Sequence, residues 1–324
     1  MKWIAILAAC MAAVVSPYPA QAQMGGQVTR IIVPFAPGGA RELLARTFYQ
    51  ELGQELGQEL GQTIIIESRP GAGGAIGTAA VARAEPDGRT LLMAASSHFV
   101  TAELGAKPHY DPIKEFQPVA NIGTQSYVLM INGNLPAKNV AEFINYARKR
   151  PGELNYGSAG IGSSTHLAMA YFLSAAGLDM LHIPYKSTQE AANDVAGGRA
   201  QAVIVPNAGV GAYLQDKRLR IIGVTSSQPS PLLPDVPPVA RAGLPSYVFE
   251  SWFGLLGPAG MPPATVEKIN AAVAKVLKLP VIQERLATQG VAPDAMGVDA
   301  FSKLFAEDRQ LMARIVKEAK LTRD

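Results

Sequence analysis

The chain is almost without cysteine. Of its 324 residues only Cys10 is a cysteine, and it lies in an apolar segment at the N-terminus. The stretch Leu7-Ala8-Ala9-Cys10 superficially matches a lipoprotein cleavage box, but cutting there would leave too short an apolar region. If the segment is removed, the mature chain has no disulfide, no thiol nucleophile and no thiolate metal site.

Long hydrophobic runs are missing beyond the N-terminus. The 13 residues from Trp3 to Val15 are almost wholly apolar and follow a basic start, but they are too few to span a bilayer. Pro17 and Pro19 break the run, and the small residues Ala20-Gln21-Ala22 follow. This order predicts a cleavable secretory signal over residues 1–22, cut after Ala22, rather than a retained anchor.

A strong charge of either sign is also absent. The formal net charge is +3, and basic residues are scattered apart from short runs such as Arg148-Lys149-Arg150. Nucleic-acid-binding domains instead gather lysine and arginine on one face or along one helix. The sequence therefore predicts no nucleic-acid partner.

No motif for catalysis or nucleotide binding is recognisable. There is no Gly-x-Ser-x-Gly elbow, and the histidines at 98, 109, 166 and 182 lack metal-ligand spacing. Gly157, Gly160 and Gly162 run Gly-x-x-Gly-x-Gly, which is not the dinucleotide fingerprint. The sequence predicts no cofactor, no metal and no enzyme, and it leaves a transferase or hydrolase open as another class.

Glycine and proline are abundant, at 31 and 24 residues, and they separate alternating strand-like and helix-like segments. The predicted strands are 28–35, 63–67, 90–94, 126–131, 154–156, 181–184, 202–205 and 219–225. The predicted helices are 43–62, 76–84, 140–149, 163–176, 189–196, 263–277, 281–289 and 298–319. This alternation is typical of an α/β protein with a mostly parallel sheet.

The tetrapeptide Glu-Leu-Gly-Gln occurs three times in tandem, at 51–54, 55–58 and 59–62. Because four residues nearly match one helical turn, Leu52, Leu56 and Leu60 fall on one face of the predicted helix. The repeat therefore indicates a lengthened helix rather than a repeat architecture or a functional site.

A series of short motifs occurs in a distinctive order. They are Val33-Pro34-Phe35-Ala36-Pro37-Gly38-Gly39, Arg69-Pro70-Gly71-Ala72-Gly73-Gly74, Pro86-Asp87-Gly88, Tyr156-Gly157-Ser158-Ala159-Gly160-Ile161-Gly162-Ser163, His182-Ile183-Pro184-Tyr185-Lys186-Ser187, Leu233-Pro234-Asp235-Val236-Pro237 and Trp252-Phe253-Gly254-Leu255. In this order the mature chain resembles the substrate-binding proteins of tripartite tricarboxylate transporters, the Bug family. It departs from the family at Glu42, where Asp is usual, and at Ser68, where Asn is usual.

The resemblance implies an α/β fold of the two-lobed periplasmic binding protein, or Venus flytrap, kind with a ligand cleft between the lobes. Residues 23–125 and 226–324 would form a discontinuous first lobe, and residues 126–225 the second. The implied function is capture of a small carboxylate in the periplasm by lobe closure, and its delivery to membrane transporter subunits by a monomer. A sensor that presents its closed form to a signalling receptor stays open as an alternative.

The first expected ligand-binding segment is Pro37-Gly38-Gly39-Ala40 with Arg41, at a strand-to-helix turn. Gly38 and Gly39 lack a Cβ, so a ligand can approach the main chain there. The N-terminus of the following helix favours a carboxylate. The alternative is a tight turn that binds nothing, with Arg41 in an exposed salt bridge, but the resemblance favours ligand contact.

The second expected segment again joins a strand to a helix. Its expected ligand contacts are Ser158, Ala159, Gly162, Ser163, Thr165 and His166. Here hydroxyls and loop amides would surround the other end of the ligand, and Ser163 or Ser164 would cap the helix. The alternative is capping alone, with His166 packed in the interior.

Four more candidates follow predicted strands, at ends where α/β sheets usually bind ligands. They are Ser96, Ser97, Tyr185 and Asn207. The alternative roles are loop capping and hinge or turn structure. Trp252, the only tryptophan outside the predicted signal, is expected to pack in the core near the lobe junction rather than to stack on a ligand.

Overall fold

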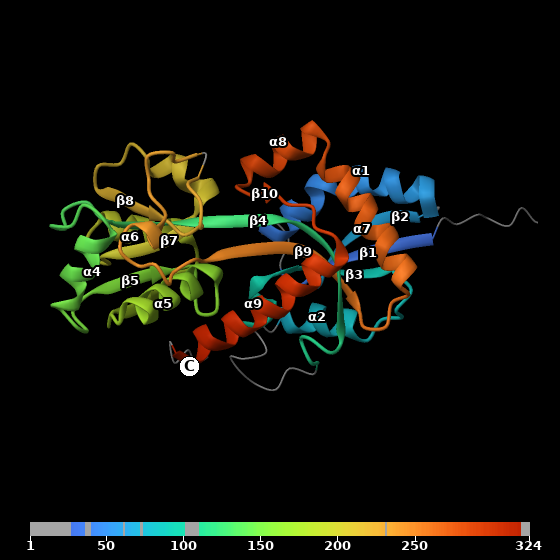
Figure 1. Ribbon diagram of the computed structural model, residues 1–324, viewed down its shortest axis with the longest axis horizontal. Helices are drawn as coiled ribbons and strands as arrows, with labels where there is room; N and C mark the ends of the chain where they lie inside the picture. The colour runs from blue at the N-terminus through green and yellow to red at the C-terminus, as the bar shows by residue number, and fades with distance from the viewer. Residues whose placement is uncertain are drawn as a thin grey trace, which may run out of the picture.

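Two long strands, β4 (Phe116–Asn132) and β9 (Glu250–Pro258), join two lobes (Figure 1). The computed structural model describes residues 27–35, 40–60, 62–71, 74–100, 110–230 and 232–318. In this part of the chain, β4 and β9 pair antiparallel from Phe116 to Ser126 of β4. From Tyr127 onward β4 leaves β9 and pairs with strands of the second lobe.

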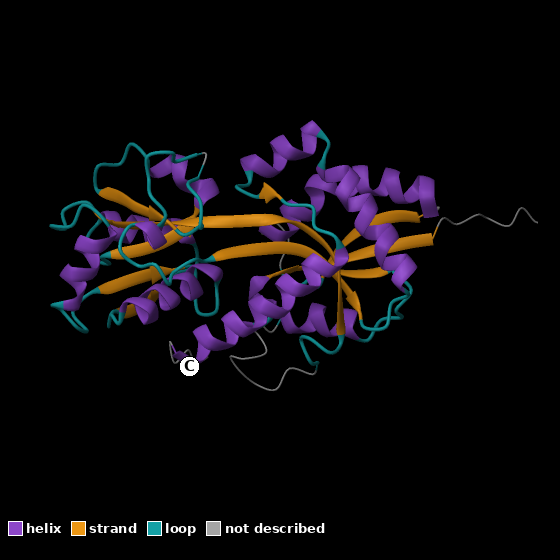
Figure 2. Ribbon diagram, viewed as in Figure 1, coloured by secondary structure: helices purple, strands orange, loops and turns teal. Residues whose placement is uncertain are grey.

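The first lobe is a sheet with helices on both faces (Figure 2). Its strands besides β4 and β9 are β1 (Gln27–Val33), β2 (Gln62–Ser68), β3 (Thr90–Ala95) and the short β10 (Ala292–Pro293). Its helices are α1 (Ala40–Leu60), α2 (Ala75–Ala82), the 3₁₀ turn η2 (Ser96–His98), α7 (Pro263–Leu277) and α8 (Pro280–Thr288). Side chains of β1 alternate between the faces: Ile31 and Val33 pack in the cluster under α1 and α7, and Ile32 in the cluster that contains Val81 of α2.

The second lobe repeats this scheme with shorter elements. Its strands are β5 (Asn155–Ser158), β6 (Leu181–Pro184), β7 (Ala202–Pro206) and β8 (Leu219–Val224). Its helices are α4 (Val140–Arg148), α5 (Ser164–Ala176), α6 (Thr188–Ala196) and the 3₁₀ turn η3 (Asn207–Tyr213). A further 3₁₀ turn, η4 (Val239–Arg241), packs beside β8 with Val239 next to Gly223. Phe143 of α4 and Phe172 of α5 stack in one cluster, whereas Val195 of α6 packs in another with Val203.

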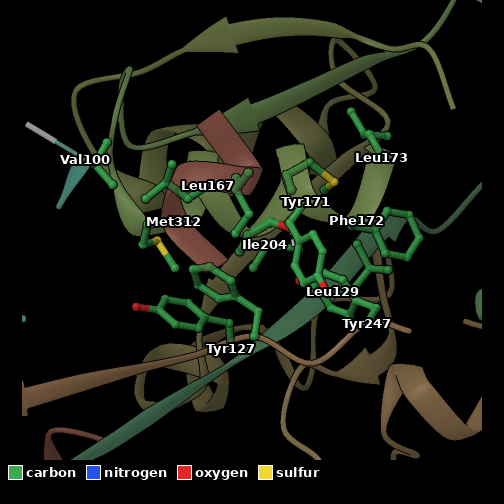
Figure 3. Packing of buried hydrophobic residues seen from close by; sticks show 14 of the residues in the cluster. Val100, Tyr127, Leu129, Leu167, Tyr171, Phe172, Leu173, Ile204, Tyr247 and Met312 are labelled. Carbon is green, nitrogen blue, oxygen red and sulfur yellow. Dashed lines mark hydrogen bonds between the residues drawn. The ribbon is translucent and has the colours of Figure 1, made fainter. Parts of the chain in front are cut away.

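The last helix, α9 (Val298–Glu318), runs along both lobes (Figure 1). Phe301 near its start packs edge-on against Trp252, with ring centroids 5.4 Å apart. At its other end Glu318 accepts a hydrogen bond of 3.0 Å from the hydroxyl of Ser174 in α5. Met312 lies between these points in the largest buried cluster, which also holds Leu167 of α5 (Figure 3).

The strand order is β2-β1-β3-β9-β4-β7-β5-β6, with β8 and β10 also paired to β4. The expectation of a mostly parallel sheet is right for β2-β1-β3 and β7-β5-β6 and wrong for the centre, where every pairing of β4 and β9 is antiparallel. The reason is that the chain crosses between the lobes once in each direction. The lobe boundaries at 125/126 and 225/226 stay a prediction.

Residues 51–60 of the tandem repeat form the second half of α1, whereas Gln62, its last residue, begins β2, so the predicted helix 43–62 is too long at its end. Leu52 and Leu56 are buried against the sheet, as the spacing predicts, and Glu55 forms a 3.2 Å salt bridge with Lys275 of α7. The predicted signal, residues 1–22, lies outside the described residues. Among the helices that are described, none combines the length and the apolar character needed to cross a membrane.

Candidate functional site

The turn between β5 and α5 brings the second expected segment together as one hydrogen-bonded unit. Gly160 and Gly162 adopt φ of +103° and +75°, a region that side chains disfavour, and so allow the chain to fold back on itself. Ser163 caps α5 by accepting from the N–H of His166 (3.2 Å). The hydroxyl of Thr165 accepts from the N–H of Ala159 (2.9 Å), which closes the turn.

Two stacked histidine rings pack against this turn and form hydrogen bonds with it. The rings of His166 and His182 are nearly parallel, with centroids 3.9 Å apart, and the ring of Tyr156 lies beside both, 4.9 Å from His182 and 6.3 Å from His166. Nδ1 of His166 accepts from the N–H of Gly162 (3.1 Å), and Nε2 of His182 lies 2.7 Å from the hydroxyl oxygen of Ser158. The histidine pair therefore fixes both arms of the turn.

Burial keeps both imidazoles neutral. It lowers the pKa of His166 to about 3, with a further contribution from His182, and lowers the pKa of His182 to about 4. At neutral pH this turn therefore carries no fixed cation, and the hydroxyls of Ser163 and Thr165 lie side by side (3.0 Å) at the N-terminus of α5. Such an arrangement suits an anion that is held by hydrogen bonds and by the N-terminus of α5.

Tyr185 follows β6 and supports the same turn. Its N–H donates to the carbonyl of Ser158 (3.0 Å), and its hydroxyl donates to Asp194 (2.7 Å). Burial, together with Asp194, raises the pKa of Tyr185 to about 12. The hydroxyl is thus already engaged within the second lobe, and the ring lies close enough to Gly157 that a Cβ there would be 3.2 Å away.

The first expected segment is described only in part. Pro37, Gly38 and Gly39 lie outside the described residues, and Ala40 and Arg41 begin α1 with side chains that are also outside them. Chain continuity still places the segment between the end of β1 and the start of α1. Its role in ligand binding stays a prediction.

Ser96 and Ser97 follow β3 at the same edge of the first lobe. Ser97 lines a small hollow together with Pro34 and Phe35, so it lies beside the end of β1 that leads into the first expected segment. Ser96 is buried, and its hydroxyl accepts from the N–H of Trp252 (3.1 Å). Trp252 itself is 2% exposed, which confirms the prediction that it packs in the core.

Asn207 lies apart from the turn, at a pocket of about 360 Å³ between the lobes. Its amide nitrogen donates to the hydroxyls of Ser126 (3.2 Å) and Ser230 (2.6 Å), whereas its Oδ1 is buried without a hydrogen-bond partner. The pocket walls come from the crossing strands and from both lobes. They are Thr124, Ser126, Asn207, Ser226, Ser227, Gln228, Pro229, Ser230, Leu232, Glu250, Ala287, Gly290, Val291, Ala292 and Pro293.

His182 and Glu250 are the site residues that the sequence did not reveal. His182 reaches the turn because β6 pairs parallel to β5 with Tyr156 opposite His182. Glu250 enters the pocket because it begins the crossing strand β9. Neither pairing has a local sequence signal. No group of three or more histidine, cysteine, aspartate or glutamate side chains that could hold a metal ion occurs among the residues that the structure describes.

Comparison with known proteins gives consistent matches along the chain. The family model TctC, described as tripartite tricarboxylate transporter family receptor, matches residues 48–321. Protein BugT from Bordetella pertussis is 32% identical over 295 residues, which cover 89% of this chain and 88% of BugT.

Solved structures agree with these matches. R. palustris Rpa4515 with adipate is 29% identical and has a TM-score of 0.74, covering 92% of this chain and 99% of that one. MatC (Rpa3494) from Rhodopseudomonas palustris with bound malate is 29% identical, with a TM-score of 0.72 and coverage of 89% and 98%. The resemblance seen in the sequence motifs and the two-lobed α/β fold are both confirmed.

Proposed function

Because this chain belongs to the family of tripartite tricarboxylate transporter receptors, we propose that it captures a small carboxylate between its two lobes and delivers it to the membrane subunits of such a transporter. The observation that carries the proposal is the β5–α5 turn. It places hydroxyls at the N-terminus of a 13-residue helix, over a neutral histidine pair. A helix N-terminus and hydroxyl donors favour a small anion such as a carboxylate.

We infer a dicarboxylate rather than a monocarboxylate. Two expected donor segments, Pro37–Arg41 in the first lobe and Ser158–His166 in the second, would each take one end of the ligand. Rpa4515 was solved with adipate and MatC with malate, and both are dicarboxylic acids. Contact with both segments would require the lobes to close, so the ligand would shift the population toward the closed form.

The proposed hinge lies where the crossing strands leave one lobe for the other. We assign residues 23–125 and 226–324 to the first lobe and 126–225 to the second. This division is supported by β4, whose pairing with β9 ends at Ser126 and whose pairing with β7 begins at Tyr127.

The protein is best tested as it is exported. We expect expression of the full chain in a Gram-negative host to yield a monomeric periplasmic protein that begins at Gln23, as N-terminal sequencing and light scattering would check. Calorimetric titration with adipate and malate, after refolding to remove carried-over ligand, should give binding to at least one. The uncharged diamide of adipate should not bind.

A matched pair of variants assigns the site. Thr165→Val removes the hydroxyl that closes the turn and should weaken dicarboxylate binding about tenfold. Thr288→Val, at an exposed hydroxyl on α8, should leave it unchanged. Equal affinities for both variants would place the ligand elsewhere, and no binding of any carboxylate would overturn the proposal.

Two alternatives have their own outcomes. A ligand consumed during the titration, detected by mass spectrometry, would indicate a transferase or hydrolase. If the ligand-bound protein captured a signalling receptor from solubilised membranes, and not transporter subunits, the protein would be a sensor. Capture of the transporter subunits, without turnover, supports the receptor role.

A further inference from the structure

We propose that the pocket between the lobes at Glu250 is a second ligand site, and that it takes a small organic amine. It lies on the side of the crossing strands where α8 and β10 are found, whereas α9 runs along the opposite side (Figure 1). Its volume of about 360 Å³ falls within the range of about 300–1,000 Å³ that is usual for small-molecule sites. The inference does not depend on the carboxylate function proposed above.

The walls of the pocket are mainly apolar, with one charge. Its apolar lining side chains include those of Pro229, Leu232, Ala287 and Val291. Among the described residues that line it, Glu250 is the only one with a formal charge. An apolar cavity with a single carboxylate selects a ligand that combines a hydrocarbon body with one cationic group.

Among the described residues, no lysine, arginine or histidine pairs with the Glu250 carboxylate. The N–H of Ser227 is a hydrogen-bond donor to its carboxylate, and a second carboxylate, Asp294, lies near enough to repel it. Burial, and then Asp294, raise the pKa of Glu250, while burial raises the pKa of Asp294. An ammonium group would supply both the positive charge and the donors that this carboxylate lacks.

Asn207 is an independent observation on the same wall. It is 6% exposed, both its amide hydrogen bonds go to serine hydroxyls, and its Oδ1 is buried without a donor. Buried acceptors without donors are costly and rare in folded proteins. Asn207 Oδ1 and the Glu250 carboxylate are therefore two acceptors on one wall that a cationic donor would satisfy, whereas Glu250 would repel a carboxylate.

The test uses three probes of equal shape and different charge. Benzylamine, benzyl alcohol and benzoate are titrated against the full exported protein by saturation-transfer NMR and calorimetry, at neutral pH. We expect benzylamine to bind at millimolar concentration or below, and benzyl alcohol at least tenfold more weakly. Benzoate should not compete with benzylamine.

Three variants locate the binding. Glu250→Gln keeps the shape and removes the charge, so it should weaken benzylamine binding at least tenfold. Ala287→Phe, at an exposed position of α8, fills the pocket from the other wall and should abolish it. Glu267→Gln, at an exposed position of α7 outside the pocket, is the matched control and should bind benzylamine as the unmodified chain does.

The outcomes separate the two proposals. Unchanged benzylamine affinity in Glu250→Gln or Ala287→Phe, with native circular dichroism, would overturn the amine site, as would failure of the unmodified chain to bind benzylamine. Adipate and malate titrations of the same variants report separately on the carboxylate site. If Ala287→Phe lost both amine and dicarboxylate binding, Glu250→Gln would distinguish the two sites, because it should lose benzylamine binding and keep dicarboxylate binding.

Discussion

The neutral histidine pair makes a clear prediction about pH at the scale of single residues. Burial holds the pKa of His166 at about 3, below its ordinary 6.5. A base with a lowered pKa stabilises the fold above its unfolded pKa, and this stability is lost as the pH falls toward the folded value. The loss approaches about 1.4 kcal/mol per pH unit for one group.

The variant that isolates this effect is His166→Phe, which keeps a flat ring on His182 and removes the titration. We expect the free energy of unfolding of the unmodified chain, minus that of the variant, to fall by about 1 kcal/mol per pH unit between pH 6 and pH 4. Urea unfolding at several pH values measures this. A difference that is constant across the range would show that His166 does not stay neutral in the fold.

Asp308 makes the opposite prediction. It is buried in α9, accepts from Nε1 of Trp252 (2.7 Å) and is hydrogen-bonded to Ser96; burial raises its pKa to about 7 against these two bonds. An acid with a raised pKa stabilises the fold below its unfolded value of about 4, and this stability is lost as the pH rises through about 7.

Asp308→Asn keeps an acceptor for Trp252 and removes the titration. We expect the variant to gain about 1–2 kcal/mol on the unmodified chain between pH 5.5 and pH 8. Because Trp252 is the only tryptophan beyond residue 3, its fluorescence should also report the ionisation in the unmodified chain, with a midpoint near 7, and lose that titration in the variant. A fluorescence signal that titrates equally in both proteins would contradict the assignment.

At the scale of elements, the crossing strands depend on glycines that admit a neighbour. Gly254 of β9 lies where a Cβ would be 2.6 Å from the ring of Phe301 and 2.8 Å from the carbonyl of Ala120. Gly254→Ala should therefore destabilise the protein by about 1–3 kcal/mol through overpacking. Gly211→Ala is the control, because a Cβ at Gly211 meets nothing within 4 Å, and it should change stability by less than about 0.5 kcal/mol.

Chemical denaturation of both variants decides the point. If Gly254→Ala proved as stable as Gly211→Ala, the approach of Phe301 and Ala120 to β9 would not constrain the strand. If both were strongly destabilised, a general effect of alanine on the backbone would explain the result instead.

Elements with local sequence signals could be predicted, and the two crossing strands could not be predicted in full. The helix over 263–277 and the strand over 181–184 agree with α7 and β6 because apolar spacing and flanking prolines are local signals. The prediction of 126–131 covers only the second half of β4, and β9 was not predicted. Pro118, Gly123 and Gly254 look like breaks in these strands, yet a Cβ at Gly123 would collide with the backbone of Ala292 in β10. That approach exists only in the folded chain.

In the candidate site, too, the locally determined part could be predicted and the part that depends on strand pairing could not. The turn at 157–166 could be predicted because its glycines and serines stand between a strand and a helix. His182 and Glu250 could not, because their places depend on the register of β6 against β5 and on where β9 begins its crossing. Local chemistry thus predicts the loops, and tertiary pairing decides which distant side chains support them.

At the scale of the whole molecule, the buried clusters predict how the lobes unfold. The largest cluster includes Leu92 of β3, Ile204 of β7 and Met312 of α9, so it extends through both lobes. A second cluster, with Met261 and Met93, holds no residue of β5 to β8. Removing a side chain from the largest cluster should therefore lower the local stability of both β3 and β7, whereas removing one from the second cluster should affect β3 more than β7.

Met312→Ala and Met261→Ala remove the same side chain from these two places, where it is 0% and 5% exposed. Each should cost about 2–5 kcal/mol in the core that it leaves. We expect hydrogen exchange to show lower protection of both β3 and β7 amides in Met312→Ala, and of β3 more than β7 in Met261→Ala. Loss confined to one lobe in Met312→Ala would mean that α9 does not couple the lobes. Equal loss at β3 and β7 in both variants would mean that the lobes open only together, which would leave closure to bending of β4 and β9 rather than to repacking around α9.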